Sequence, residues 1–411
     1  MAEEKKNIPK LRFREFTGDN ANAWELRRAD EIFKTISDKG HPDLTVLSAS
    51  QEHGMIPRND VGVDIKYDKK NTANYKRVKP EQFVIHLRSF QGGFAWSEIE
   101  GITSPAYTVL DYKETGKYSF DFWKEVLTSP NFIKRLESVT YGIRDGRSIS
   151  FSDFSTLKFS SPEIREQQKI GSFFKHLDEL ITLHQRMLDE YKTLKKTMLS
   201  KMFPKNGEKY PELRFSGFTD AWELRKLGEM GKTFSGLSGK KKEDFGHGNA
   251  RFVTYMNVFN NTITNPKLLE KVELDNKQNK VKFGDVFFTT SSETPEEVGM
   301  SSIWLDDLEN VYLNSFCFGY RTDIEMSPYY LAFVLRSPNV RKKFMVLAQG
   351  ISRYNISKNK VMNISIPIPD IGEQQKIGSF FKHLDELITL HQRELELLKT
   401  LKKTMLQQMF V

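Results

Sequence analysis

Residues 166–186 of the chain read EQQKIGSFFKHLDELITLHQR, and residues 373–393 repeat the same 21 letters. The match continues from KTLKKTML at 192–199 to KTLKKTML at 399–406. Weaker matches precede each copy: PKLRFREFT at 9–17 returns as PELRFSGFT at 211–219, and AWELRR at 23–28 returns as AWELRK at 221–226. The chain is therefore a tandem duplication, in which a short LRF lead-in, a globular part and a long helical segment each occur twice.

The two kinds of segment have diverged to very different extents. The helical segments are nearly identical, whereas the globular parts share only scattered anchors such as LTSPN at 127–131 and LRSPN at 335–339. This difference indicates that the helices do one job twice, while the globular parts do two related jobs with different details.

Apolar residues in both helical segments recur with a seven-residue period, which predicts a coiled coil. The first helix is expected over about 163–203, because Pro204 stops it. The simplest partner of each helix is the other copy, as an antiparallel pair with a pseudo-two-fold axis. The alternative is two separate surface helices, each packed on its own domain. The residues assigned to the coiled coil and to partner docking are Ile170, Phe173, Phe174, Leu177, Leu180 and Ile181, and in the second copy Ile377, Phe380, Phe381, Leu384, Leu387 and Ile388.

The same period places Leu194 and Leu401 on the seam of the helix pair, together with His184 and His391. The two histidines are interpreted as hydrogen-bonded core residues that fix the register; a metal held between them is the alternative.

The bulk composition is that of a folded protein with a basic surface. Of its 411 residues, 38% are hydrophobic and 28% charged, and the formal net charge is +8. Such an excess of positive charge favours polyanionic partners, of which nucleic acid is the commonest. Cys317 is the only cysteine, which excludes an internal disulfide and a cysteine-built zinc site. Because the sequence has neither an apolar run long enough to span a bilayer nor the apolar core of a signal peptide, we expect a cytoplasmic protein.

The globular parts are expected to be mixed α/β units with short strands. Apolar runs predict strands at 82–90, 285–292, 301–305, 316–322 and 364–368. Helices are expected at 120–127 and 328–337, and each leads to the shared SPN turn and a basic helix.

Polar and basic loops between these elements are the candidates for contact with nucleic acid. Arg, Asn, Gln, Ser and Thr side chains hydrogen-bond to base edges, whereas lysine-rich runs hold phosphates. The alternative for each loop is ordinary solvated surface. The candidates are Arg88, Ser89, Gln91, Arg144 and Arg147 in the first half, and Lys240, Lys241, Lys242, Asn257, Thr290, Ser291, Glu293, Arg353, Asn355 and Lys358 in the second.

The sequence contains no convincing catalytic constellation. KLGEMGKT at 226–233 resembles the end of a phosphate-binding loop, but Lys226 stands where that motif needs a glycine. Asp370, Glu373 and Lys376 are spaced loosely like a nuclease signature, yet they fall at a helix start, where acidic residues stabilise the helix dipole. We therefore expect a chain without catalysis, metal or cofactor of its own.

The doubled EQQKI helix resembles the conserved helical regions of the specificity subunits of Type I restriction–modification enzymes. SFQGGFAWSEIEGITSPAY at 89–107 and GDVFFTTSSETPEEVG at 284–299 resemble the middle of the target-recognition domains of that family. The LRF lead-ins also fit, so the resemblance covers essentially the whole chain.

This resemblance implies an α+β fold: two mixed α/β target-recognition domains separated by an antiparallel two-helix coiled coil, as a pseudo-two-fold tandem repeat. The expected divisions are 1–161 and 207–368 for the domains, and 162–206 and 369–411 for the helices. Each domain would read one half of a bipartite double-stranded DNA site, with half-sites about ten base pairs apart.

The resemblance also implies the partners. Two methyltransferase subunits would dock on the helices, bind S-adenosylmethionine and methylate adenine, and motor–nuclease subunits would use ATP and Mg for restriction. The alternative is a non-enzymatic coiled-coil scaffold whose two end domains bind proteins. The sequence leaves the DNA target and the length of its gap open, because base readout depends on loop geometry, water and DNA shape.

Overall fold

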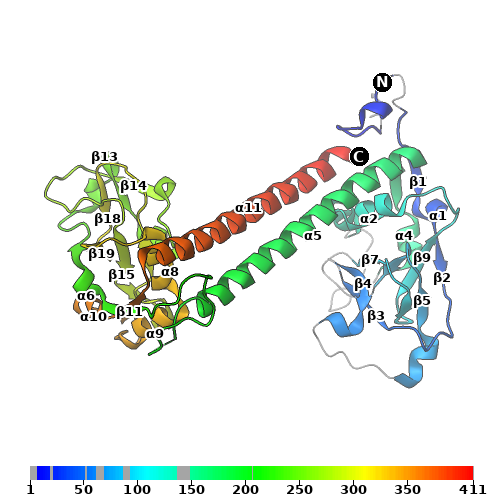
Figure 1. Cartoon of the computed structure of the whole chain (residues 1–411). Coiled ribbons are helices and arrows are strands. Elements are labelled where there is room, and N and C mark those ends of the chain that lie inside the picture. Colours follow the sequence, from blue (N-terminus) through cyan, green and yellow to red (C-terminus); the bar gives the residue numbers. More distant parts are fainter. Residues whose placement is uncertain are drawn as a thin grey trace. The chain divides into compact units, whose positions relative to one another are not determined.

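The computed structural model describes residues 7–18, 22–50, 53–61, 69–86, 93–136, 149–205 and 207–410. The chain divides into two compact units, one of residues 1–184 with 394–411 and one of residues 185–393. We call them unit 1 and unit 2 and describe each by itself (Figure 1). Each unit contains one globular part and a portion of each long helix, α5 (Ile164–Lys201) and α11 (Ile371–Met409).

Unit 1 is built around an antiparallel four-stranded sheet of order β2-β9-β6-β7. Smaller two-stranded sheets pair β1 with β10, β3 with β4 and β5 with β8. The strands are β1 (Glu25–Arg28), β2 (Phe33–Ile36), β3 (Leu47–Ser50), β4 (Gly54–Pro57), β5 (Lys76–Val78), β6 (Phe83–Ile85), β7 (Phe94–Trp96), β8 (Gly101–Thr103), β9 (Thr108–Tyr112) and β10 (Lys158–Ser161); the helices are α1 (Ala29–Ile32), α2 (Phe120–Thr128), α3 (Pro130–Leu136) and α4 (Phe151–Ser155).

Unit 2 repeats this plan with a four-stranded sheet of order β12-β19-β15-β17. The register repeats as well, since Thr35 lies opposite Leu110 in unit 1 and Thr233 opposite Tyr320 in unit 2. The strands are β11 (Glu223–Lys226), β12 (Gly231–Ser235), β13 (Phe245–Val253), β14 (Leu269–Val272), β15 (Val286–Thr289), β16 (Ser291–Ser292), β17 (Ser301–Ile303), β18 (Val311–Leu313), β19 (Cys317–Thr322), β20 (Tyr354–Asn355) and β21 (Ser365–Ile368); the helices are α6 (Leu227–Met230), α7 (Tyr255–Asn260), α8 (Pro328–Arg336), α9 (Pro338–Val346) and α10 (Lys358–Met362).

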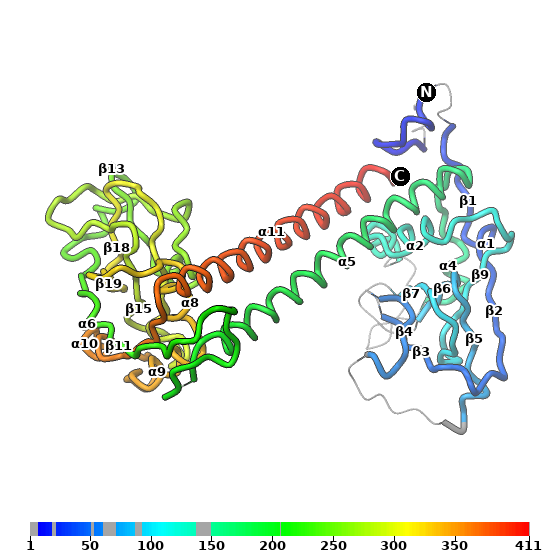
Figure 2. Tube along the Cα trace, in the orientation of Figure 1, coloured from blue at the N-terminus to red at the C-terminus, as the bar shows by residue number. Residues whose placement is uncertain are grey.

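Within each unit the two long helices run antiparallel, as the duplication predicted. In unit 1, Phe174 of α5 lies 5.7 Å from the ring of Phe410, which follows α11, and further along α5 Asp178 pairs with Lys402. In unit 2, the ring of Tyr191 stacks on His391 at 5.4 Å. Figure 2 follows the chain from the end of α5 through the second lead-in to β11.

The predicted phase of the helix seam is wrong at two positions. Leu194 and Leu401 are 37% and 39% exposed, so they face away from the seam. The next residues take their place: Lys195 pairs with Asp385 in unit 2, and Lys402 pairs with Asp178 in unit 1. A search for apolar residues does not find lysines at the contact between two helices. Here, however, the aliphatic stem of each lysine packs between the helices, and an aspartate of the other helix neutralises its charge.

Each lead-in arginine clamps the start of a long helix through a buried ion pair. Arg12 binds both carboxylate oxygens of Glu166, and Arg214 binds both oxygens of Glu373 at 2.7 Å. The Glu166 and Glu373 side chains are 1% and 0% exposed. The repeated LRF and EQQ motifs therefore meet in space, and the bidentate geometry fixes the angle at which each lead-in meets its helix.

The identical glycines of the two helices allow a close approach to the globular part of each unit. A Cβ on Gly171 would lie 2.7 Å from the backbone nitrogen of Phe122 at α2, and one on Gly378 would lie 2.8 Å from that of Tyr330 at α8. Three positions after each glycine, Phe174 and Phe381 are fully buried in the cores of their units. Much of the repeated helix sequence thus serves intramolecular packing.

Candidate nucleic-acid interface

Two of the predicted contact loops of unit 2 meet at one short sheet. β16 pairs with β20, which sets Ser291 opposite Asn355 and Ser292 opposite Tyr354. Ile356 donates its backbone N–H to the carbonyl of Thr290 at 2.9 Å. Residues 290–293 and 351–355 therefore lie side by side although they are far apart in the sequence. Because both segments are candidates for contact with bases, we call them together the reading strip.

The exposed polar groups of the reading strip are those of Glu293, Ser352, Arg353 and Asn355. Thr290 is half-buried and donates its hydroxyl hydrogen to the carbonyl of Phe316 at 2.7 Å, and the Ser291 side chain is buried. The strip thus offers a carboxylate acceptor, a hydroxyl, an amide and a guanidinium, which are groups that hydrogen-bond to base edges.

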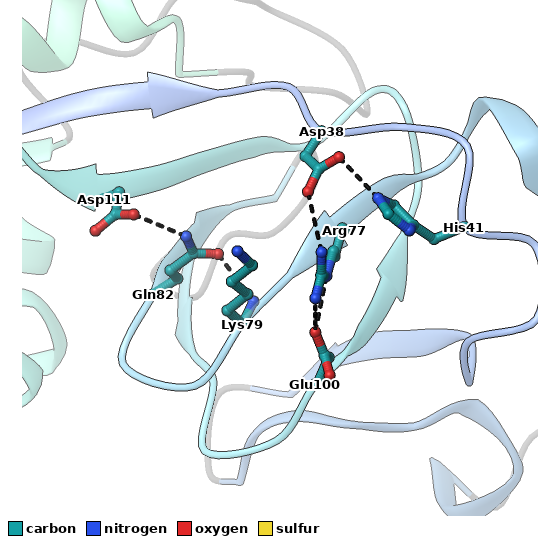
Figure 3. A network of polar contacts seen from close by, with 7 residues as sticks. All are labelled: Asp38, His41, Arg77, Lys79, Gln82, Glu100 and Asp111. Carbon is teal, nitrogen blue, oxygen red and sulfur yellow. Dashed lines mark hydrogen bonds and ion pairs between the residues drawn. The ribbon is translucent and has the colours of Figure 1, made fainter.

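A turn network fixes the strand that leads into each candidate loop. In unit 1, the Lys79 N–H donates to Gln82 Oε1 at 2.8 Å, and Gln82 Nε2 donates to Asp111 at 2.9 Å (Figure 3). In unit 2 the same device is an ion pair, in which Arg321 donates to both oxygens of Asp285 at 2.7 Å. Asp285 also accepts the Lys282 N–H at 2.7 Å, so both turns are closed by a side chain that is tied to the neighbouring strand.

The same view of unit 1 shows a chain of charges beside β5 (Figure 3). Arg77 donates to Glu100 at 2.7 Å and to Asp38 at 3.5 Å, and Asp38 contacts His41 at 2.8 Å. The hydrogen bond to His41 lowers the pKa of Asp38, and Glu100 raises the pKa of Arg77. These groups neutralise one another, so we interpret them as a link between the segment after β2 and the pair β5–β8.

The three consecutive lysines of unit 2 are not equivalent. Lys240 pairs with Asp275 at 3.2 Å and is only 12% exposed, while Lys241 and Lys242 are exposed. Hydrogen bonds from Lys277 and Gln278, with the contact to Lys240, lower the pKa of Asp275 to about 2. Two of the three lysines therefore keep charges that can meet a phosphate.

Lys358 follows the reading strip and is half-buried. Its ammonium group donates to the hydroxyl of Ser235 at 3.0 Å, and it lies 5.9 Å from the ring centre of Phe318. One hydrogen of the ammonium group is thus used to tie α10 to the end of β12.

The structure argues against direct base contact by Asn257. Its side chain is 2% exposed, and its amide donates to the carbonyl of Asn265 at 2.8 Å. Its oxygen accepts the Asn265 N–H at 2.9 Å and an N–H of Asn261 at 3.1 Å. The sequence pattern, a polar residue after a strand, cannot distinguish a side chain that faces the ligand from one that closes the local turn.

The first-half candidates Arg88, Ser89, Gln91, Arg144 and Arg147 lie outside the described residues. In the sequence, Arg88, Ser89 and Gln91 come shortly after β6 (Phe83–Ile85). Because β6 and β15 occupy the same place in their sheets, residues 87–92 follow the same strand end as residues 290–299.

The helix residues assigned to docking divide into two groups. Ile170, Phe174, Leu177, Ile377, Phe381 and Leu384 are buried in the cores of their own units, while Phe173, Leu180, Ile181, Phe380, Leu387 and Ile388 are half-buried. The first group packs in the cores of the two units and is not accessible to a partner. Leu183 and Leu390, identical in the two copies, are 49% and 50% exposed, and self-packing does not account for their identity.

The basic residues on the two sides of the SPN turn of unit 2, Arg336 at the end of α8 and Arg341 in α9, have structural roles. Arg336 donates to four backbone carbonyls, among them those of Val258 and Ser301, and burial lowers its pKa to about 10. Arg341 binds the carbonyls of Glu296, Val298 and Gly299. Arg336 thus ties the end of α7 to β17, and Arg341 supports the loop at 296–299. The charge of an arginine in the sequence does not distinguish such a structural role from DNA contact.

Among the residues that the structure describes, no three His, Cys, Asp or Glu side chains gather in a way that could hold a metal ion. Within the same residues, no helix is long and apolar enough to cross a membrane.

Two segments of the chain, residues 22–193 and 219–400, match the family model of the Type I restriction modification DNA specificity domain. Two specificity subunits of Methanocaldococcus jannaschii are similar to this chain. The Type I restriction enzyme MjaVIII specificity subunit is 24% identical over 281 residues, which cover 61% of this chain and 60% of that protein. The putative Type I restriction enzyme MjaX specificity subunit is 23% identical over 266 residues, which cover 62% of this chain and 59% of that protein. The match thus spans about three fifths of each relative.

Among solved structures, the S subunit of a Type I restriction–modification system from M. genitalium has a similar fold. The TM-score is 0.55 at 15% sequence identity, and the match covers 98% of this chain and 99% of that one. The two matched segments cover most of the sequence and correspond to its two repeats. The chain therefore belongs to the family of the Type I restriction modification DNA specificity domain and carries two copies of that domain.

Proposed function

We propose that this chain is the DNA-reading specificity subunit of a Type I restriction–modification complex and does no chemistry itself. One observation carries the proposal: the two domains share their sheet order and register but differ where their central strands end. In the sequence, Thr290, Ser291 and Ser292 follow β15 in the second copy, whereas Leu87, Arg88 and Ser89 come after His86 and β6 in the first. Two readers with one scaffold and different contact residues fit a target made of two unlike halves.

The division into domains at 1–161 and 207–368 and helices at 162–206 and 369–411 is part of this proposal. In it, Arg353, Asn355 and Glu293 contact base edges in one half-site, and Lys241 and Lys242 contact phosphates. The corresponding contacts in the other half-site come from Arg88, Ser89, Gln91, Arg144 and Arg147.

The proposed role as a specificity subunit also includes the partner subunits. Two methyltransferase subunits hold S-adenosylmethionine and methylate adenine, and motor–nuclease subunits use ATP and Mg. The exposed identical faces of the helices, with Leu183 and Leu390, are where we expect the two methyltransferase subunits to dock, because one partner met twice requires the same surface twice.

The test is to map methylated bases in cells that produce this chain with its methyltransferase. We expect a split motif with two unrelated halves. Replacing Arg353 and Asn355 by alanine should relax or change one half only, and the matched exchange Arg88→Ala with Gln91→Ala should change the other half only. A motif in which both halves change together would contradict the proposal. A chain that captures proteins but shifts no DNA in a gel would favour the scaffold alternative.

A further inference from the structure

The reading strip carries an apolar side chain where a polar one is expected. Ile351 is 96% exposed, more than any other large hydrophobic residue described. An isolated exposed leucine or isoleucine needs no explanation, but this one lies at the tip of a turn, directly before the exposed polar residues Ser352 and Arg353. Its position indicates a contact that is made only when a ligand is present.

The turn that carries Ile351 is closed tightly. Gln349 and Asn355 exchange two backbone hydrogen bonds, of 3.0 and 2.8 Å, and β20 pairs with β16 directly beside them. Gly350 has φ +142°, and a Cβ there would lie 2.0 Å from the carbonyl oxygen of Arg353. The exposed side chain is therefore presented on a fixed turn, which lowers the entropy lost when it is ordered against a ligand.

The neighbours of Ile351 are the groups expected at a DNA surface. Arg353 and Asn355 are exposed on the same turn, and Lys358 follows it. A second apolar side chain, Phe316, is 62% exposed on the other side of Thr290, whose N–H and hydroxyl both donate to the Phe316 carbonyl. Positive and amide groups with apolar side chains among them are typical of proteins that insert a wedge between base pairs.

We propose that Ile351 enters the base stack of the half-site read by unit 2 and parts two neighbouring base pairs. The inference rests on the proposed function, since it assumes that the reading strip meets DNA. Arg353 beside it neutralises phosphates or reads an edge at the opened step, and Phe316 packs against the displaced bases. A step that opens easily, such as a pyrimidine–purine step, would then be preferred even where no hydrogen bond reads it.

The test uses the full chain in complex with its methyltransferase and a duplex that carries the mapped target. 2-Aminopurine is placed at one position at a time in and beside this half-site, because its fluorescence rises when it is unstacked. The methylated adenine is left out, since the partner opens that base itself. With the natural chain we expect a severalfold rise at one step. Ile351→Ala should remove the rise and weaken binding by about tenfold, while Ile351→Met, which keeps a long apolar side chain, should retain both.

Phe283→Ala is the matched control. Phe283 is 56% exposed and precedes β15, at the opposite end of that strand from Thr290, so its loss should leave the fluorescence and the affinity unchanged. If the natural chain binds its target tightly and the 2-aminopurine fluorescence rises at no position, Ile351 does not enter the base stack, while the proposed function still stands. A rise in fluorescence that persists with Ile351→Ala would also refute the proposal. If affinity falls when uracil replaces thymine at one position and no position becomes brighter, Ile351 contacts a methyl group instead of entering the stack, and the proposal is refuted. Failure of the natural chain to bind any mapped target would refute the proposed function itself.

Discussion

Replacing Arg214 by methionine should destabilise unit 2 strongly. The substitution keeps most of the volume of the side chain but leaves the carboxylate of Glu373, which is 0% exposed, without the two 2.7 Å hydrogen bonds that it accepts now. Breaking a buried ion pair in this way costs about 3–5 kcal/mol, because an uncompensated charge stays buried. We therefore expect the opening free energy of the first turns of α11 to fall by that amount.

Hydrogen exchange measured by mass spectrometry is the suitable assay, since it reports on each unit separately. Peptides of unit 1 serve as the internal reference for Arg214→Met, and Arg12→Met should give the reverse pattern, because Arg12 clamps Glu166 in unit 1. Arg27→Met is the exposed control: its partner Glu25 is 68% exposed, and such pairs contribute less than about 1 kcal/mol.

The double variant Arg214→Met with Glu373→Met should recover most of the loss, because an apolar pair of similar size is often as stable as a buried ion pair. If Arg214→Met changes exchange no more than Arg27→Met does, or if the double variant is as unstable as the single one, the clamp does not hold the helix and the reasoning fails.

Three further outcomes follow from the structure. Cys317 is 3% exposed and burial raises its pKa to about 12, so iodoacetamide at about pH 8 should label it only after unfolding, as mass spectrometry can determine. Burial raises the pKa of Glu125, so the stability that its protonated form contributes is complete below the ordinary glutamate pKa and is lost as the pH rises through the raised one; Glu125→Gln should therefore reduce the pH dependence of the free energy of unfolding of unit 1 in urea above about pH 4.5. Replacing Lys241 and Lys242 by glutamine should weaken binding alike on all sequences and reduce the salt slope by up to about 2, whereas Lys240→Gln, whose charge is paired with Asp275, should change the slope less.

The sequence was sufficient for the features that repeat or alternate. The predicted strand at 316–322 is observed as β19 (Cys317–Thr322), and the helix expected over 163–203 is observed as α5 (Ile164–Lys201). Both rest on periodicity, which reports burial directly. The antiparallel helix contacts within each unit follow from the path that a duplicated chain must take.

The features that depend on which way a polar side chain faces could not be predicted. Lys195 and Lys402 occupy the helix seam because an aspartate across from each neutralises it, and no apolar pattern contains that information. Asn257 was expected at the DNA surface but closes a buried turn. The arginine clamps were visible only as a repeated LRF motif, since a contact between residues 214 and 373 requires the fold to be known.

The composition of unit 1 has a consequence for how the protein is made. Its core includes Met409, which is 3% exposed, and Phe410, whose ring packs on those of Trp24 and Phe122. These residues leave the ribosome only after the whole of unit 2 has been synthesised. The core of the domain that is translated first is therefore completed last. Until then the parts of Trp24 and Phe122 that Phe410 covers stay exposed, and the nascent first domain presents an apolar surface that chaperones are able to recognise.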